Sequence, residues 1–436
     1  MPSLTVWGQR LVKFELAWQR HQQVRAIRHA LRLTFPLVFL GSLATFIDQA
    51  WLQTTGYYYQ TLHVNHWLLQ LTLLKRYVRL VSAGTLGFSG IMVAFAVSYY
   101  LVADKTAHPT DRLLAGVRAV IGMKFFNVDR GTVLQVQSIK WSANNLGLSG
   151  ILLGILMGVL VGDSFRWVVQ RRTTQEEPLT QPLWLTSIWT LGTAAVGLLW
   201  VSAQTVSFNA TLIGLLRWPF RLSHFIVGLW GFSALTGVFA WLGMLGPLAT
   251  TGQTVETAQN LAAVLLHHGW QLPYPLTVHT VISVYANFGG SGMVLGLLLA
   301  LFLTRPPRAQ RRIGWLSVLP TLGNLNAPLM TGLPVILDPL LGIPFLLAPL
   351  ATITVSWICL RLNWVPAVAY PLAAGTPAPL LAYLGTGGNW RAFALALVDL
   401  AISTAIYWPF LKWLWLAEAQ GGDEKRSDDC RGHPFF

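Results

Sequence analysis

Long apolar stretches, separated by short polar segments, constrain this chain more than any other feature. They lie roughly at 35–55, 80–103, 146–169, 184–206, 223–248, 276–304, 330–359, 364–385 and 392–416. About 20 apolar residues in a helix are enough to cross the hydrocarbon layer of a membrane. Only 11% of the residues are charged, whereas soluble domains carry about 25%. We therefore predict an all-α polytopic membrane protein with about ten transmembrane helices.

The segment 323–339, GNLNAPLMTGLPVILDP, is irregular although its surroundings are apolar. Asn324 and Asn326 add polarity, and Pro328, Gly332 and Pro334 interrupt a regular helix. Hydrocarbon tolerates such backbone only where protein or a water-filled cavity satisfies its polar groups. The run predicts a re-entrant hairpin whose two amides line an internal cavity. In the alternative interpretation, the amides satisfy only the backbone groups that the break sets free.

The charge distribution predicts the topology. The chain has 30 Lys and Arg against 16 acids, and the basic residues lie beside apolar segments rather than in a separate domain. This pattern fits the positive-inside rule and not a nucleic-acid-binding protein. We expect both termini in the cytoplasm, and residues 10–32 as an amphipathic helix on the membrane surface. The basic stretch is too long for a cleavable signal peptide.

Metal and cofactor chemistry finds no support in the sequence. The two cysteines, Cys359 and Cys430, are far apart, and the adjacent pair His267 and His268 has no acidic or Cys companion at ligand spacing. The chain also has no phosphate-binding P-loop motif. We expect no metal site and no cofactor.

Three clusters of small residues punctuate the apolar segments. LGFSGI at 86–91 and LGLSGI at 146–151 resemble each other, and close helix packing explains both. The third cluster, NFGGSGMVLG, differs in kind. Its Asn287, Gly290 and Ser291 combine exposed backbone with polar side chains, which suits a ligand that approaches the main chain.

These segments together resemble the sugar permease subunit, enzyme IIC, of the bacterial phosphotransferase system, in its lactose, cellobiose and diacetylchitobiose branch. The resemblance is carried, in order, by AIRHALRLTFPLVFLGSL (26–43), GTLGFSGIMVAFAVSYYLVA (84–103), NLGLSGI (145–151), NFGGSG (287–292), GNLNAPLMTGLPVILDPLLGIPFLLAPL (323–350), GTPAPLLAYLGTGGNWRAF (375–393) and IYWPFLK (406–412). It implies a homodimeric permease in the bacterial cell membrane, with an enzyme IIC glucose-superfamily-like fold.

The resemblance also implies a division of the chain. We expect a cytoplasmic amphipathic segment at 1–34, a dimerisation region at 35–215, a substrate-binding region at 216–416 and a polar cytoplasmic tail at 417–436. In such proteins a sugar, here expected to be a cellobiose-like disaccharide, enters from outside. Its 6-hydroxyl is then phosphorylated by enzyme IIB, which receives the phosphoryl group from enzyme IIA.

The chain departs from the family pattern at three positions. Ala327 stands where the family has a glutamate in Asn-x-Asn-Glu-Pro, and Trp230 stands where it has the histidine of Gly-Ile-His-Gly. Ala374 replaces a tryptophan on which a sugar could stack. A positioned acid or base contributes roughly 10² to 10⁴ in rate. The sequence therefore leaves open whether this chain supports phosphotransfer, and a role for Asp338 as a compensating base is one possibility.

Sugar binding loses less than catalysis. The expected ligand-binding residues are Trp230, His279, Asn287, Gly290, Ser291, Asn324, Asn326 and Thr376. For His279, a hydrogen bond to backbone at a helix end is the alternative. Two functions stay open: a phosphotransferase-system sugar permease, and a diverged paralogue that acts without phosphorylation as a facilitator, a sensor or a partner of another permease.

Overall fold

The computed structural model describes residues 6–67, 70–104, 108–128, 140–170, 182–203, 208–221, 225–245, 255–267 and 272–432. His224 and His268 lie outside these ranges, and the side chains of His267 and Cys430 are not described. No β-strand occurs among the described residues, which confirms the all-helical fold.

The helices are α1 (Val6–Arg20), α2 (Gln22–Ile47), α3 (Tyr57–Thr61), α4 (Leu71–Leu86), α5 (Ser89–Ala103), α6 (Pro109–Phe126), α8 (Ala143–Leu146), α9 (Ile151–Gln170), α10 (Pro182–Ala203), α11 (Phe208–Arg217), α12 (Phe225–Leu242), α13 (Val255–His267), α14 (Val294–Leu303), α15 (Arg308–Leu322), α16 (Ala327–Gly332), α17 (Pro339–Arg361), α18 (Ala378–Gly385) and α19 (Trp390–Gly432). π-Helical turns occur at Asp48–Leu52 and His279–Ser283. Short 3₁₀ turns occur at Val64–His66, Leu148–Gly150 and Trp218–Arg221.

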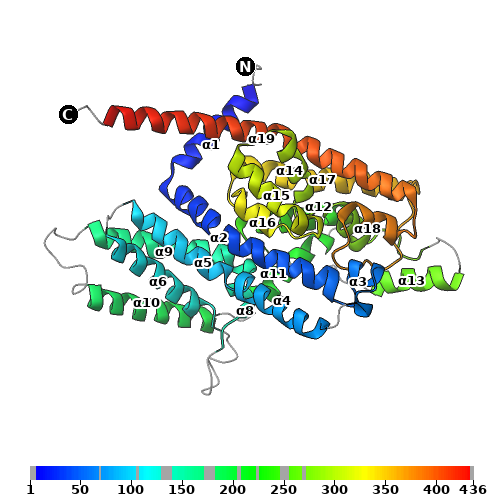
Figure 1. The fold of residues 1–436 in the computed structure, drawn as a ribbon, viewed down its shortest axis with the longest axis horizontal. Helices are drawn as coiled ribbons and strands as arrows, with labels where there is room; N and C mark the ends of the chain where they lie inside the picture. Colours follow the sequence, from blue (N-terminus) through cyan, green and yellow to red (C-terminus); the bar gives the residue numbers. More distant parts are fainter. Residues whose placement is uncertain are drawn as a thin grey trace.

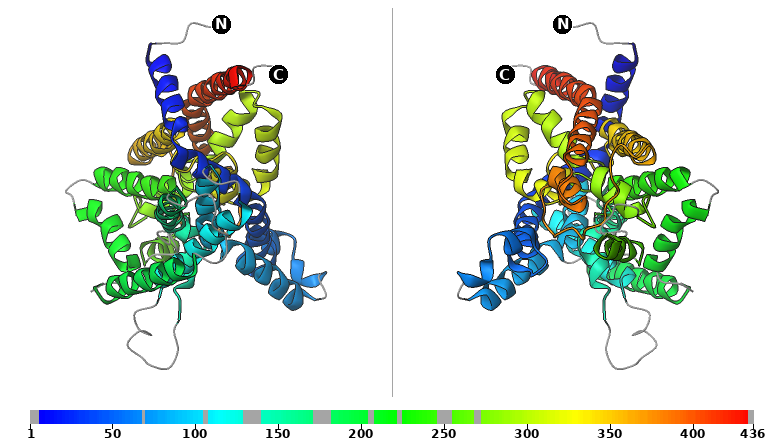
Figure 2. Two further views of the ribbon diagram at one scale, coloured as in Figure 1. Left: turned by 90° about the vertical axis from the view of Figure 1, so that its left-hand side faces the viewer. Right: turned by 90° about the vertical axis from the view of Figure 1, so that its right-hand side faces the viewer.

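Helix α2 runs through the middle of the molecule and joins its two groups of helices (Figure 1). It packs on α4 and α5 on one side and on α15 and α16 on the other. Helix α1 contacts both α19 and α17, so the first helix crosses the last one at one end of the bundle (Figure 2). Side chains near the start of α2 can therefore reach the C-terminal half of the chain.

Small residues bring α5 and α9 close together. A Cβ on Gly154 would lie 2.3 Å from the Gly90 carbonyl oxygen, and one on Gly90 would lie 2.8 Å from the Leu146 carbonyl oxygen. Real Cβ atoms essentially never come this near, so only glycine fits. The two similar motifs, LGFSGI and LGLSGI, thus pack on each other, and the interpretation of both as helix-packing sequences is confirmed.

Six helical segments of the described residues are long and apolar enough to cross a membrane. They are Gln22–Leu52, Leu71–Ala103, Leu148–Trp167, Phe225–Leu242, Pro339–Arg361 and Trp390–Gln420. Two shorter apolar helices, Ser187–Ser202 and Val294–Leu303, add to them. The protein is therefore a multi-pass membrane protein, and the count of about ten spanning helices stays a prediction.

The N-terminal region differs from the single surface helix expected over residues 10–32. The chain breaks at His21, whose backbone is extended (φ −64°, ψ 129°). Glu15 is completely buried, and helix α2 continues without interruption to Ile47. A buried carboxylate needs a partner inside the protein, so one face of this region is turned toward the bundle.

Candidate functional site

The glycine-rich loop after the π-helical turn His279–Ser283 adopts a backbone that only glycine takes easily. Gly289, Gly290 and Gly292 have φ angles of +77°, +91° and +82°. L-residues with a side chain rarely adopt such angles. The loop is compact, because the Gly290 amide donates to the Asn287 carbonyl at 3.0 Å and the Leu295 amide donates to the Phe288 carbonyl at 3.0 Å. It offers main-chain groups at close range to whatever lies beside it.

Asn324 and Asn326 meet this loop. Asn324 Oδ1 accepts a hydrogen bond from the Gly289 amide at 2.9 Å, and Asn326 Nδ2 donates to the Ser291 carbonyl at 3.5 Å. A Cβ on Gly290 would lie 3.0 Å from the Asn326 Cβ. Two segments 35 residues apart in the sequence are thus joined by side-chain hydrogen bonds.

Each amide keeps one group for another partner. Asn324 Nδ2 and Asn326 Oδ1 have no hydrogen-bond partner among the described residues. Neither atom is one of the fully buried side-chain atoms that lack a hydrogen-bond partner. An amide has both donor and acceptor capacity. The pair can therefore hold the backbone and still offer one donor and one acceptor to a polar ligand.

The far side of the loop is fixed by α19 and α17. Tyr407 donates its hydroxyl to the Gly292 carbonyl at 2.5 Å, and the Tyr407 side chain is completely buried. A Cβ on Gly292 would lie 2.2 Å from the Phe345 ring. The loop is therefore held on two sides, which preserves its geometry for a ligand.

Ala327 opens α16 directly after Asn326. It is only 4% exposed, and its carbonyl accepts from the Thr331 hydroxyl at 2.9 Å. The position lies beside the candidate ligand-binding amides, but alanine brings no acid or base to it. Asp338 accepts from the Leu341 amide at 2.9 Å as the N-cap of α17, and its role as a compensating base stays a prediction.

The remaining predicted residues are not joined to this cluster by a described contact. Trp230, on α12, donates its indole N–H to the Thr354 hydroxyl on α17 at 3.1 Å and is 38% exposed. Thr376 donates to the Ala373 carbonyl at 2.7 Å. His279 begins the π-helical turn that precedes the loop.

Ala374 lies against another part of the chain. Its carbonyl accepts from the Tyr57 amide at 2.9 Å, and its own amide donates to the Thr55 carbonyl at 3.0 Å. The segment that carries Ala374 and Thr376 therefore packs on the region between α2 and α3. Among the described residues, no group of three or more His, Cys, Asp or Glu side chains could hold a metal ion.

Comparison with known families decides the identity of the chain. A family model described as "Phosphotransferase system, EIIC" matches residues 28–349. The chain belongs to this family. EIIC proteins are the sugar permease components of phosphotransferase systems and work with EIIB.

Two relatives of this EIIC cover nearly its whole length, and a third covers less than a third of it. The permease IIC component YwbA of Bacillus subtilis is 26% identical over 94% of this chain and 96% of its own. The lichenan permease IIC component of the same organism is 24% identical over 92% and 90%. The cellobiose-specific EIIC component of Lactococcus lactis is 34% identical over 30% of this chain and 26% of its own.

Among solved structures, the transporter ChbC, the IIC component of the N,N'-diacetylchitobiose-specific system, aligns with 92% of this EIIC and 96% of its own chain. The identity is 19% and the TM-score is 0.38.

A buried ion cluster in this EIIC was not predicted from the sequence. Arg28 of α2 donates through one nitrogen, Nη2, to Glu15 Oε1 at 2.5 Å and to Asp338 Oδ2 at 2.7 Å. The three side chains are 12%, 0% and 2% exposed. Burial and the nearby Glu15 carboxylate raise the pKa of Asp338 to about 7, although Arg28 acts in the opposite direction.

Two tryptophans hold the backbone beside this cluster. Trp18 of α1 donates its indole N–H to the Leu337 carbonyl at 3.1 Å, and Trp241 of α12 donates to the Asp338 carbonyl at 2.8 Å. One signal in the sequence pointed to Asp338, since Asp followed by Pro339 is a common start of a helix. Nothing in the sequence paired it with Arg28.

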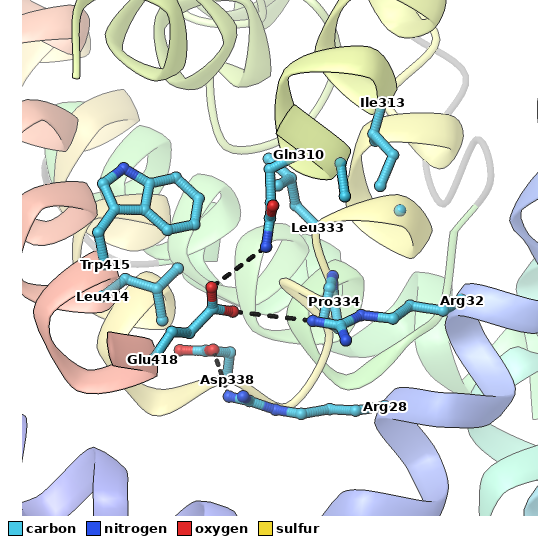
Figure 3. A pocket seen from close by; sticks show the side chains of 12 residues that line it. Arg28, Arg32, Gln310, Ile313, Leu333, Pro334, Asp338, Leu414, Trp415 and Glu418 are labelled. Carbon is cyan, nitrogen blue, oxygen red and sulfur yellow. Dashed lines mark hydrogen bonds and ion pairs between the residues drawn. The ribbon is translucent and has the colours of Figure 1, made fainter. Parts of the chain in front are cut away.

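A cavity of about 180 Å³ adjoins the cluster. Helices α2, α15 and α19 and the segment after α16 surround it (Figure 3). Its polar and aromatic wall consists of Arg28, Arg32, Gln310, Asp338, Trp415 and Glu418. Gln310 Nε2 donates to Glu418 Oε2 at 3.1 Å, and Arg32 lies 3.7 Å from Glu418 Oε1. The cavity lies beside Gly332, at the opposite end of α16 from Asn326.

Proposed function

We propose that this EIIC binds a β-linked disaccharide of glucose or a related hexose on the glycine-rich loop and the two asparagines. The observation that carries the proposal is the pairing of Asn324 with Gly289 and of Asn326 with Ser291, which leaves one donor and one acceptor available. Relatives named for lichenan, cellobiose and oligo-β-mannoside support a substrate of this class.

The complete system includes further partners. Enzyme IIB phosphorylates the 6-hydroxyl of the bound sugar, and enzyme IIA supplies enzyme IIB. Residues 35–215 form the dimer of two identical chains, and residues 216–416 carry the sugar. Backbone groups of the loop and the partner protein orient the hydroxyl, since Ala327 offers no acid or base.

Membrane vesicles that contain this EIIC test the function directly. Radiolabelled cellobiose is added on the outside, with phosphorylated enzyme IIB inside, and the phosphorylated sugar is separated from the free sugar. Formation of cellobiose phosphate only when both proteins are present supports the permease function. Uptake of unmodified cellobiose without phosphate ester would contradict phosphotransfer and favour the second function.

The second function is transport or sensing without phosphorylation, and the replacements at Ala327 and Trp230 favour it. The double variant Ala327→Glu with Trp230→His restores both family side chains. If these vacancies limit the chemistry, the variant forms more phosphorylated sugar in the same vesicles, by roughly 10² to 10⁴ in rate. A folded, sugar-binding variant without any gain would show that the vacancies do not limit it.

Both termini face the cytoplasm in this proposal, because basic residues dominate the N-terminal region and the segment 305–312. The tail carries Cys430, which an impermeant thiol reagent should not modify in intact cells. Rapid modification before the cells are opened would reverse the assigned orientation. The variant Cys430→Ser is the control for labelling at Cys359.

A further inference from the structure

The cavity beside the ion cluster is balanced in charge. Its wall contains two guanidinium groups and two carboxylates, and each arginine faces an acid: Arg28 lies 2.7 Å from Asp338, and Arg32 lies 3.7 Å from Glu418. Glu15, behind Arg28, adds a third carboxylate. Because each arginine is already paired with a carboxylate, an anion would find no unpaired guanidinium group there, and a cation would meet two arginines. A neutral ligand with several hydroxyl groups fits such a wall.

The wall also contains an unsatisfied acceptor. Gln310 Oε1 is buried and has no hydrogen-bond partner among the described residues, while its Nε2 donates to Glu418. A buried acceptor without a partner is costly. A hydroxyl group of a ligand would satisfy it once the Gln310 amide turns toward the cavity.

Aromatic surface is present beside these polar groups. Trp415 borders the cavity, and its indole N–H donates to the Thr304 hydroxyl at 3.1 Å, which fixes the ring (Figure 3). A fixed indole gives the apolar face of a sugar ring a surface to pack on. Carboxylate, amide and guanidinium groups around an indole can together bind the hydroxyls and the ring of a carbohydrate.

The depth and size of the cavity match a small ligand from solution. Asp338 and Arg28 are 2% and 12% exposed and form its floor, whereas Arg32 and Glu418 are 45% and 25% exposed and bring it to the surface. A volume of about 180 Å³ holds about six waters. This is room for one sugar ring and not for a disaccharide.

We propose that this cavity is a second sugar site, which takes a single neutral hexose ring and is separate from the glycine-rich loop. The inference rests on the proposed function. Helix α16 connects the two sites, since Asn326 precedes it and Gly332, at its end, lines the cavity. A sugar phosphate is disfavoured here, because its dianion would face Asp338 and Glu418. The second site therefore distinguishes substrate from product.

Calorimetric titration of the purified full chain with methyl β-D-glucoside, a single ring, tests the proposal. The expected result is two equivalents bound. Glu418→Gln and Gln310→Leu each weaken the affinity of the cavity site by roughly 10- to 100-fold, which corresponds to the loss of a hydrogen bond that involves a charged or buried group. Both variants leave the affinity of the glycine-rich loop unchanged. Glu256→Gln, which replaces an exposed glutamate in the first turn of α13, is the matched control and keeps both.

Several results would overturn the inference. One result is that only one equivalent of methyl β-D-glucoside binds, that Asn326→Ala abolishes this binding, and that Glu418→Gln and Gln310→Leu leave it intact. This result would remove the second site and keep the proposed function. No bound methyl β-D-glucoside at all would remove the second site, whereas the proposed function is tested separately with cellobiose. Displacement of methyl β-D-glucoside from the Gln310-sensitive site by inorganic phosphate would make the cavity an anion site instead.

Discussion

Arg28 and Asp338 are 310 positions apart in the chain, yet their side chains meet at 2.7 Å inside the protein. The contact joins helix α2 to the residue that caps α17. Glu15 of α1 accepts from the same nitrogen of Arg28. Three helices from the two ends of the sequence thus depend on one guanidinium group.

Removal of this guanidinium should destabilise the folded protein strongly. Arg28→Ala leaves two buried carboxylates without a cation, and the loss of one partner of a buried ion pair costs roughly 3 to 5 kcal/mol. The free energy of unfolding in detergent measures the effect. The matched control is Arg25→Ala, whose pair with Asp104 is 41% and 43% exposed at 3.5 Å and contributes at most about 1 kcal/mol. Equal losses in both variants would contradict the role of Arg28.

The same cluster predicts how stability depends on pH. The pKa of Asp338 is raised from 3.8 to about 7 in the folded protein. Between these values the folded state binds more protons than the unfolded state, so the free energy of unfolding falls as the pH rises from about 4 to about 7. Asp338→Asn keeps an N-cap residue and should lose this part of the pH dependence. Parallel pH curves for the two proteins would refute the prediction.

Asn324 and Asn326 should differ in what they support. Asn324 accepts at 2.9 Å from the buried Gly289 amide and has a φ of +64°, so Asn324→Ala should cost about 1 to 3 kcal/mol of stability. Asn326 makes only a 3.5 Å bond. Asn326→Ala should instead weaken the binding of cellobiose by about 1 to 3 kcal/mol. Thermal unfolding and titration on each purified variant separate the two. If Asn326→Ala loses stability and keeps its affinity, its amide holds only the hairpin.

Gly290 should not tolerate a side chain. At φ +91°, a Cβ would be strained and would lie 3.0 Å from the Asn326 Cβ. Gly290→Ala should lower stability by about 1 to 3 kcal/mol and reduce sugar affinity, because it moves Asn326. Gly192→Ala on α10 has no atom within 4 Å of its new Cβ and serves as the control for both measurements. Unchanged sugar affinity in Gly290→Ala would show that the loop and the amide are not coupled.

Local features of the sequence predicted the fold class and the irregular segments. Apolar length indicated the membrane helices, and glycines and prolines indicated the irregular backbone at Gly289 and at Asn324, just before α16. These signals lie within a few residues of each other, so a sequence reveals them.

The ion cluster could not be predicted in the same way. Arg28 lies in a basic N-terminal region that the positive-inside rule explains completely. Asp338 lies in a segment whose asparagines are the more evident polar feature. Their pairing depends on the path of α2 through the bundle. The role of Trp230 as a ligand contact stays a prediction, and the bond from its indole to Thr354 could not be inferred from its motif position. Both contacts depend on long-range packing.

The hydrogen bond from Ser356 of α17 to Asp399 of α19, at 2.6 Å, has a consequence for biogenesis. Asp399 is completely buried within the segment Trp390–Gln420, and an aspartate at the centre of a helix opposes its insertion by about 2.5 to 3.5 kcal/mol. Helix α17 leaves the ribosome before α19. Helix α19 should therefore insert into the bilayer efficiently only when α17 is already present beside the translocon. The two helices should then insert cooperatively.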